Sequence, residues 1–239
     1  VSMKATGFTA VMSSRIEPTD SLEHFATPPW STRALMEHVI GRGKYPLKAM
    51  NCWEPAAGEG HMSEVLREYF GTVHGSDVHD YGCGFVVGSF IGEGLDVTHF
   101  PHGLRPDFII TNPPFALAVD FAERALDEAR VGVALLLRSV WTEGRERYER
   151  LFRDRPPTKI AVFSERVPMT KGGWDPEAST ATSYSWFVWE RAEMGRPTQM
   201  VWIPPGQRQA LERPTDRQRF AKTTPHRDSP SQLFGHEAG

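Results

Sequence analysis

The sequence is poor in cysteine, in long apolar runs and in net charge, and each shortage argues against a class of protein. Only two cysteines occur in 239 residues, so we expect Cys52 and Cys83 to be reduced thiols and not part of a disulfide framework. The longest apolar run, residues 131–137, is far too short to span a bilayer. The formal net charge of −3 gives no overall attraction to nucleic acid or membranes, so any contact with a polyanion must come from a local patch.

The first residues also lack the order of a secretion signal, in which a basic stretch precedes an apolar one. We therefore expect a cytoplasmic protein. Ordinary apolar and aromatic contents of 39% and 11% predict one globular domain with a sizeable core. We place an N-terminal arm at 1–24, the folded domain at 25–203, and a polar, disordered C-terminal tail with nothing to bury at 204–239.

Short apolar runs alternate with helical patterns along the folded domain. This alternation predicts an α/β, Rossmann-like fold, with a mostly parallel seven-stranded sheet and helices on both faces. A helix capped by Ser31 or Thr32 is expected to bury Leu35, Met36, Val39 and Ile40. The predicted strands are 49–53, 72–77, 108–111, 131–137, 159–163, 185–189 and 199–203, with 95–97 as a further short candidate.

Residues 107–115 read Asp-Phe-Ile-Ile-Thr-Asn-Pro-Pro-Phe. Two prolines, which cannot donate to a sheet ladder, stop a buried strand and leave Asn112 and Phe115 at its carboxyl end, where open α/β sheets bind ligands. The Asn112 amide oxygen and the Pro113 carbonyl could hold both N–H groups of an adenine amino group, in a turn made rigid by Pro113 and Pro114. Phe115 could stack on the base. The alternative is a strand-ending turn with a core phenylalanine.

Upstream, residues 54–60 read Glu-Pro-Ala-Ala-Gly-Glu-Gly between a predicted strand and a helix. Small residues let a ligand approach the backbone closely, but the loop lacks the Lys-Ser/Thr of a phosphate cradle. Glu54 favours a cationic ligand such as a sulfonium or an ammonium. Asp77 ends the next strand, where it could accept two ribose hydroxyls or simply cap a turn. Asp96 could meet an adenine amino group.

Two regions after the Asn-Pro-Pro-Phe turn are candidates for nucleic-acid contact. Three Glu-to-Arg pairs at i,i+4 predict a helix over 142–153, which together with the nearby Arg138, Arg155 and Lys159 could follow a phosphate backbone or be a solvated face. Residues 164–183 predict a long functional loop. Within it Lys171 could contact substrate, and Trp174 could cover the second face of the base or anchor the loop in the core.

Together these pieces resemble S-adenosylmethionine-dependent N6-adenine DNA methyltransferases, in particular the amino-methyltransferase group whose cofactor motifs precede the catalytic motif, and within it small phage- or prophage-type members. The resemblance covers 25–203 and rests on Phe25-Ala-Thr-Pro-Pro, the 54–60 loop and Asn112-Pro-Pro-Phe115, in that order. It implies a methyltransferase domain in which Asn112 and Pro113 hold the target amino group. It further implies a cofactor site made of Phe25, Thr27, Pro28, Glu54, Pro55, Ala56, Gly58, Asp77, Asp96 and Asn112.

The implied activity is methyl transfer from S-adenosylmethionine to adenine N6 in DNA, with short or relaxed sequence preference because few residues follow the last strand. Loop 164–183 and the arginine-rich helix 142–153, called the basic helix below, would then recognise the target, or a partner protein would do so. RNA adenine methylation, glutamine methylation of a protein and an inactive cofactor-binding scaffold are the alternatives. No metal is expected, because neither His74, Asp77, His79 and Asp80 nor His99 and His102 match a ligand spacing.

Overall fold

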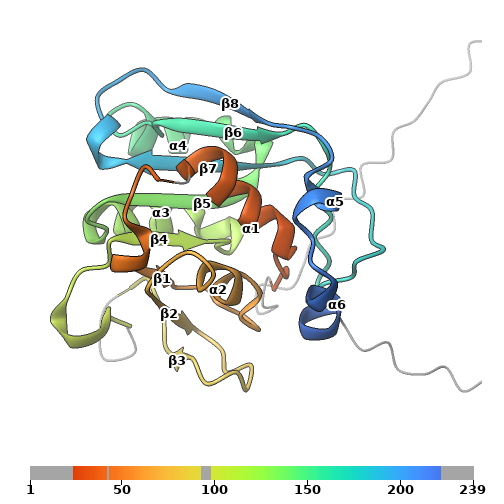
Figure 1. The fold of residues 1–239 in the computed structure, drawn as a ribbon. Helices are drawn as coiled ribbons and strands as arrows, with labels where there is room; N and C mark the ends of the chain where they lie inside the picture. The colour runs from red at the N-terminus through yellow and green to blue at the C-terminus, as the bar shows by residue number, and fades with distance from the viewer. Residues whose placement is uncertain (1–23, 42, 93–97, 222–239) are drawn as a thin grey trace, which may run out of the picture.

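The computed structural model describes residues 24–41, 43–92 and 98–221, and one sheet forms its centre (Figure 1). In this part of the chain eight strands lie in the order β3-β2-β1-β4-β5-β7-β6-β8. Neighbouring strands are parallel except where β7 meets β5 and β6. The predicted α/β class is confirmed. The strands are β1 (Asn51–Glu54), β2 (Thr72–Asp77), β3 (Val86–Val87), β4 (Phe108–Thr111), β5 (Gly132–Arg138), β6 (Lys159–Phe163), β7 (Tyr184–Glu190) and β8 (Gln199–Ile203).

The strand count differs from the predicted seven because of β3, a two-residue strand at the sheet edge beside β2. Its residues are too few to produce a recognisable pattern. The other candidate strand, 95–97 with Asp96, lies outside the described residues. β7 and β8 are consecutive in the chain but are not neighbours, because β6 lies between them.

Successive side chains of the central strands enter two separate hydrophobic cores. In β4, Phe108 and Ile110 belong to one core and Ile109 to the other, as the two-residue period of a strand requires. Burial on both faces explains why 108–111 and 132–137 read as continuous apolar runs and not as alternating ones.

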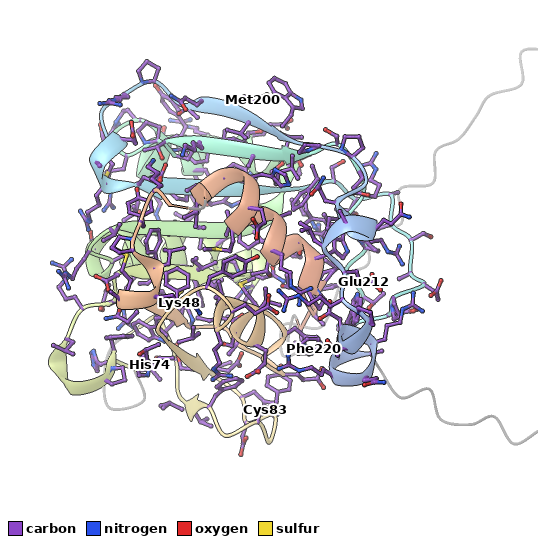
Figure 2. All side chains as sticks on the ribbon, in the orientation of Figure 1. Lys48, His74, Cys83, Met200, Glu212 and Phe220 are labelled. Carbon is purple, nitrogen blue, oxygen red and sulfur yellow. The ribbon has the colours of Figure 1, made fainter. Side chains whose placement is uncertain are left out.

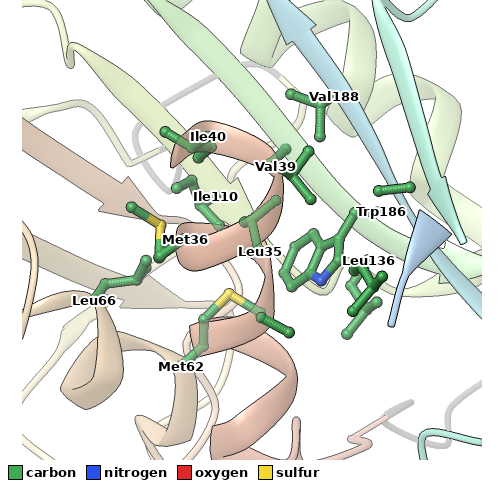
Figure 3. Close-up of a cluster of buried hydrophobic side chains, with 14 of the residues drawn as sticks. Leu35, Met36, Val39, Ile40, Met62, Leu66, Ile110, Leu136, Trp186 and Val188 are labelled. Carbon is green, nitrogen blue, oxygen red and sulfur yellow. The ribbon is translucent and has the colours of Figure 1, made fainter. Parts of the chain in front are cut away.

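Helices cover both faces of this sheet (Figure 1). In the first core Leu35, Met36, Val39 and Ile40 pack onto the sheet as predicted (Figure 3). None of the described helices combines the length and apolar character needed to cross a membrane. The α-helices are α1 (Pro29–Leu35), α2 (His61–Leu66), α3 (Ala118–Glu128), α4 (Arg145–Arg147), α5 (Gln207–Leu211) and α6 (Pro214–Phe220). The π and 3-10 turns are η1 (Met36–Gly41), η2 (Leu47–Ala49), η3 (Pro101–Gly103), η4 (Phe115–Leu117), η5 (Ser139–Thr142), η6 (Tyr148–Phe152) and η7 (Arg191–Glu193).

Two predicted helix starts are wrong. α1 begins at Pro29 with Pro28 as its N-cap, so Ser31 and Thr32 lie inside the first turn. Proline suits the first helical position because its missing N–H would have had no helical partner there. The predicted helix 142–153 is interrupted at Gly144, whose φ is +118°, and continuous helix runs only through α4 and η6.

The expectation of a tail with nothing to bury is wrong for residues 204–221. They form α5 and α6, which lie beside loop 164–183 (Figure 1). The anchor is Asp216, fully buried, which accepts two hydrogen bonds from the equally buried Arg33 of α1 at 2.6 and 2.8 Å. The side chains of Glu212 and Phe220 in this region are seen in Figure 2. A charged pair leaves no apolar period in the sequence, which is why a composition argument overlooked these helices.

Candidate active site

The strand order reverses at β1, and polar residues end the strands around this point. β1 lies between β2 and β4, and open parallel sheets bind ligands at the carboxyl edge where the order reverses. Here Glu54 ends β1, Asp77 ends β2, and Asn112 directly follows β4. The topology therefore brings three of the predicted site residues to one edge of the sheet.

A cleft opens at this edge. Its volume is about 800 Å³ including the part open to solvent. No lysine or arginine is among the described residues that line it, so its walls offer little to balance a phosphate. Pro28 and Pro113 are buried and do not line it. The predicted residues that do are Phe25, Thr27, Glu54, Pro55, Ala56, Gly58, Asp77, Asn112 and Pro114.

Glu54 is a buried acid in the wall of this cleft. Its side chain accepts a hydrogen bond from the Ser63 hydroxyl of α2, and the residue is 2% exposed. Burial raises the pKa of Glu54 well above its usual value, the nearby Asp77 raises it further, and the Ser63 hydrogen bond opposes the rise. A bound cation would stabilise the ionised form. The position therefore fits a sulfonium or ammonium group.

Asp77 holds the glycine-bearing loop in place. One of its carboxylate oxygens accepts the Gly58 N–H at 2.8 Å, and the other accepts the His79 N–H at 3.0 Å. Gly58 has a φ of +53°, and a Cβ there would lie 2.8 Å from the ring of His24, so this position requires glycine. Asp77 is thus a turn cap. Because each carboxylate oxygen can accept a second hydrogen bond, ribose binding stays a prediction.

Asn112 has one end of its amide fixed and the other end unsatisfied. Its Nδ2 donates to the Phe25 main-chain oxygen at 2.9 Å and to Thr27 Oγ1 at 3.2 Å, and it lies 3.6 Å from the sulfur of Met169. A carbonyl oxygen cannot donate, so these contacts fix which end of the amide is nitrogen. The Oδ1 atom is buried and has no hydrogen-bond partner among the described residues. An orphaned buried acceptor costs about 1–3 kcal/mol, so this oxygen is a candidate acceptor for a ligand donor.

Phe115 lies at the start of η4 among other rings. Its ring centroid is 5.7 Å from that of Phe25 and 6.2 Å from that of Tyr184. The guanidinium of Arg138, at the end of β5, lies over the ring at 4.7 Å. The structure therefore brings the predicted residues Phe115 and Arg138 together beside the Asn-Pro-Pro turn.

Loop 164–183 has the predicted length and carries no helix or strand, but its tryptophan lies elsewhere than expected. Trp174 is 1% exposed and its backbone forms an isolated bridge with Ala221. It is therefore a core anchor for the loop, and its assignment to the second face of a base is wrong. Lys171 is exposed and its backbone bridges to Phe25, so the loop braces the segment that holds Asn112.

The basic helix is mostly neutralised by carboxylates. Of its three predicted Glu–Arg pairs, only Glu146 with Arg150 forms, at 3.0 Å, and Arg150 also binds Asp120 and Glu123 of α3. The Arg147 guanidinium donates instead to the main-chain oxygen of Glu143, and Arg153 pairs with Asp154. Arg145, Arg155 and Lys159 each have an acidic partner too. The solvated-face interpretation accounts for these contacts.

Sequence reasoning missed several residues of the cleft. The rings of His24 and Tyr81 stand 4.7 Å apart, and both line the cleft. His61 of α2 also lines it, with Nε2 3.1 Å from the Phe220 oxygen. The ring of Phe90 forms another part of the wall. His24, Tyr81 and Phe90 come from loops and His61 from the start of α2, so no local spacing connects them. Within the described residues no group of three or more His, Cys, Asp or Glu could hold a metal ion.

Solved structures with this fold are known. A candidate class I S-adenosylmethionine-dependent methyltransferase from Listeria monocytogenes superposes with a TM-score of 0.53, at 11% identity, over 80% of this chain and 70% of its own. The chain has a class I methyltransferase fold. The modification subunit of a candidate type I restriction enzyme from Vibrio vulnificus YJ016 matches this methyltransferase fold with a TM-score of 0.50 and 14% identity, over 82% of this chain and 51% of its own. This chain thus spans about half the length of that subunit. No protein-family model and no curated protein matches the sequence.

Proposed function

We propose that the protein binds S-adenosylmethionine and transfers its methyl group to the N6 amino group of adenine in DNA. The observation that carries this proposal is the Asn112 amide. Its nitrogen is held by Phe25, and its buried oxygen has no partner in the part of the chain that the structure describes. An adenine amino group has two N–H donors and a nitrogen whose lone pair is delocalised into the ring. A fixed acceptor at this place would orient those donors and favour the more nucleophilic geometry.

The cleft residues suit the proposed cofactor. S-adenosylmethionine supplies an electrophilic methyl group on a cationic sulfur. Glu54, buried and hard to ionise alone, would pair with its positive charge, while Gly58 and Asp77 would border its nucleoside part. Phe25 and Thr27 would stand at its methionine end. The Asp96 contact with the cofactor's adenine remains a prediction, because that residue lies outside the described residues.

DNA is favoured over RNA by one observation outside this chain. A protein that shares the fold is described as the modification subunit of a restriction enzyme. On this chain, Asn112 and Phe115 would recognise the base and not the sugar, so both nucleic acids belong in the test. A duplex substrate would need its adenine flipped out, which costs a few kcal/mol.

The test is transfer of an isotope-labelled methyl group from S-adenosylmethionine to DNA and RNA of matched sequence, single- and double-stranded. Nucleosides from the digested products are then analysed by mass spectrometry. We expect labelled N6-methyladenine from DNA. Label in RNA alone would reject the DNA substrate, and cofactor binding without transfer to either would support the scaffold alternative. Asn112→Ala should abolish transfer and leave cofactor affinity within several-fold, and an unchanged rate would remove Asn112 from the mechanism.

A further inference from the structure

Arg138 differs from the other arginines near the catalytic turn in what it contacts. Arg150 and Arg155 are bound to carboxylates, whereas the described part of the chain gives Arg138 no acidic partner. Its guanidinium is exposed and lies 4.7 Å from the centre of the Phe115 ring. Its strand partner is Tyr184. Burial raises the pKa of the Tyr184 hydroxyl, and both the charge of Arg138 and its side-chain hydrogen bond to this hydroxyl oppose the rise. The positive charge of Arg138 thus lies over Phe115, the ring that is proposed to stack on the target base.

We propose that Arg138 covers Phe115 in the free protein, leaves the ring when a target base enters, and then binds a phosphate of the substrate strand. The inference rests on the proposed function, because it assigns the contact to a polynucleotide substrate. It makes Arg138 a positioning residue that exchanges one partner for another. The exchange involves no covalent step.

The relative strengths of the two contacts favour this exchange. Phe115 is half-buried. A guanidinium over a ring at an exposed site stabilises by about two- to fivefold in an equilibrium constant, and by more where the pair is desolvated. A base stacked on an aromatic side chain gains about 5- to 150-fold, so the base displaces the guanidinium. The displaced group keeps its charge beside the flipped nucleotide. There it can bind a phosphate through two charge-assisted hydrogen bonds, a geometry that suits arginine in particular.

The exchange predicts opposite effects of Arg138→Ala at low and high salt. At low salt the variant lacks one phosphate contact, so it should bind single-stranded DNA about two- to fourfold more weakly. The slope of log affinity against log salt should fall by about 0.7 for the lost contact. At high salt the phosphate contribution is screened, and the base no longer has to displace a guanidinium. The variant should then bind about two- to fivefold more tightly than the wild type, so the two curves cross.

The experiment measures fluorescence anisotropy of a labelled, adenine-containing 20-nucleotide DNA strand, and of RNA of the same sequence, from about 50 mM to about 1 M salt. Arg196→Ala is the matched control. Arg196 is 66% exposed, pairs with Glu193 and lies in the turn before β8, where the strands begin, whereas Arg138 lies where β5 ends. It removes the same charge and should leave the slope unchanged. Arg138→Lys should restore most of the slope. Thermal melting of each variant checks that it is folded.

Parallel curves for the wild type and Arg138→Ala, or an equal loss of slope in Arg196→Ala, would overturn the exchange. Curves that converge without crossing would reject the covering of Phe115. If the wild type methylates DNA while either result is found, the proposed function stands and the inference fails. If the wild type binds and methylates RNA alone, the DNA substrate fails, and the same crossing is expected with the RNA strand.

Discussion

The amide nitrogen of Asn112 donates a hydrogen bond to the main-chain oxygen of Phe25, 87 residues earlier, across 2.9 Å. The carbonyl of Phe25 is held in turn from loop 164–183, because Phe25 bridges to Lys171 and the Gly172 N–H donates to the oxygen of His24. Three distant segments thus decide which way one amide points. As a consequence, the oxygen of Asn112 faces no hydrogen-bond donor within residues 24–41, 43–92 and 98–221.

Thr27 should act through Asn112. Its hydroxyl accepts from the amide nitrogen at 3.2 Å, so Thr27→Val keeps the shape and removes the contact. We expect kcat for methyl transfer to fall about tenfold, which corresponds to one lost hydrogen bond of about 1.4 kcal/mol. Thr27→Ser retains the oxygen and should stay near the wild type. Initial-rate kinetics would check this, and a weaker cofactor affinity at unchanged kcat would assign Thr27 to the cofactor alone.

Much of this site could be predicted from the sequence because its parts are local. Glu54, Asp77 and Asn112 each end an apolar run, and parallel strands bring their carboxyl ends to one edge. Trp174 could not be placed in the same way. Whether an aromatic side chain in a loop faces a ligand or the core depends on residues far away in the sequence. For Trp174 one such residue is Ala221, and no short sequence spacing indicates this contact.

Glu54→Gln should stabilise the free protein and weaken cofactor binding. Because burial raises the pKa of Glu54 in the folded state, the folded protein holds this proton more tightly than the unfolded chain does. That preference favours folding at low pH and is lost as the pH rises through the raised pKa. Glutamine does not ionise, so the folded protein need not bury a charge at neutral pH, and its side-chain oxygen can still accept the Ser63 hydrogen bond. We therefore expect a higher Tm than the wild type at neutral pH, with a difference that shrinks as the pH falls.

Cofactor affinity should move in the opposite direction. Loss of one charge-assisted contact would weaken S-adenosylmethionine binding by about 10- to 100-fold. In the wild type a bound cation lowers the pKa of Glu54, so binding should release a proton. Calorimetric titration in buffers of different ionisation enthalpy measures this release, and the Glu54→Gln variant should lack it. Equal proton release in both proteins would show that another group titrates.

Arg33 should be the main attachment of the C-terminal helices. It is 2% exposed and binds Asp216 and Glu68, and removing it leaves the buried Asp216 carboxylate without the guanidinium that neutralises it. Such a loss costs about 3–5 kcal/mol, so Arg33→Ala should lower the free energy of unfolding in urea by about that amount. Arg213→Ala is the control, since its side chain is 52% exposed and also pairs with Glu68. Its cost should be about 0–1 kcal/mol, and equal losses would contradict this assignment.

The C-terminal helices show what composition cannot reveal. Residues 204–221 are rich in arginine and proline, which is typical of disordered segments, yet Asp216 is fully buried. A buried ion pair with Arg33, 183 residues away, attaches this region, and Leu211 packs against the hydrophobic core beside it. Sequence patterns detect periodic burial, whereas this contact depends on two isolated residues. Only the folded chain brings them together.

His61 should make the stability of this region depend on pH. Burial lowers the pKa of His61 below its usual 6.5, and the nearby Phe220 oxygen opposes the shift. The folded state therefore disfavours the protonated His61 ring. The contribution of the neutral ring to the free energy of unfolding is complete above pH 6.5. As the pH falls below that value the unfolded chain takes up a proton first, so stability declines toward the lowered pKa. His61→Gln removes this titration while other histidines remain. On acidification the Tm of the wild type should therefore fall more than the Tm of His61→Gln. A Tm difference that is constant with pH would show that the pKa of His61 does not change on folding.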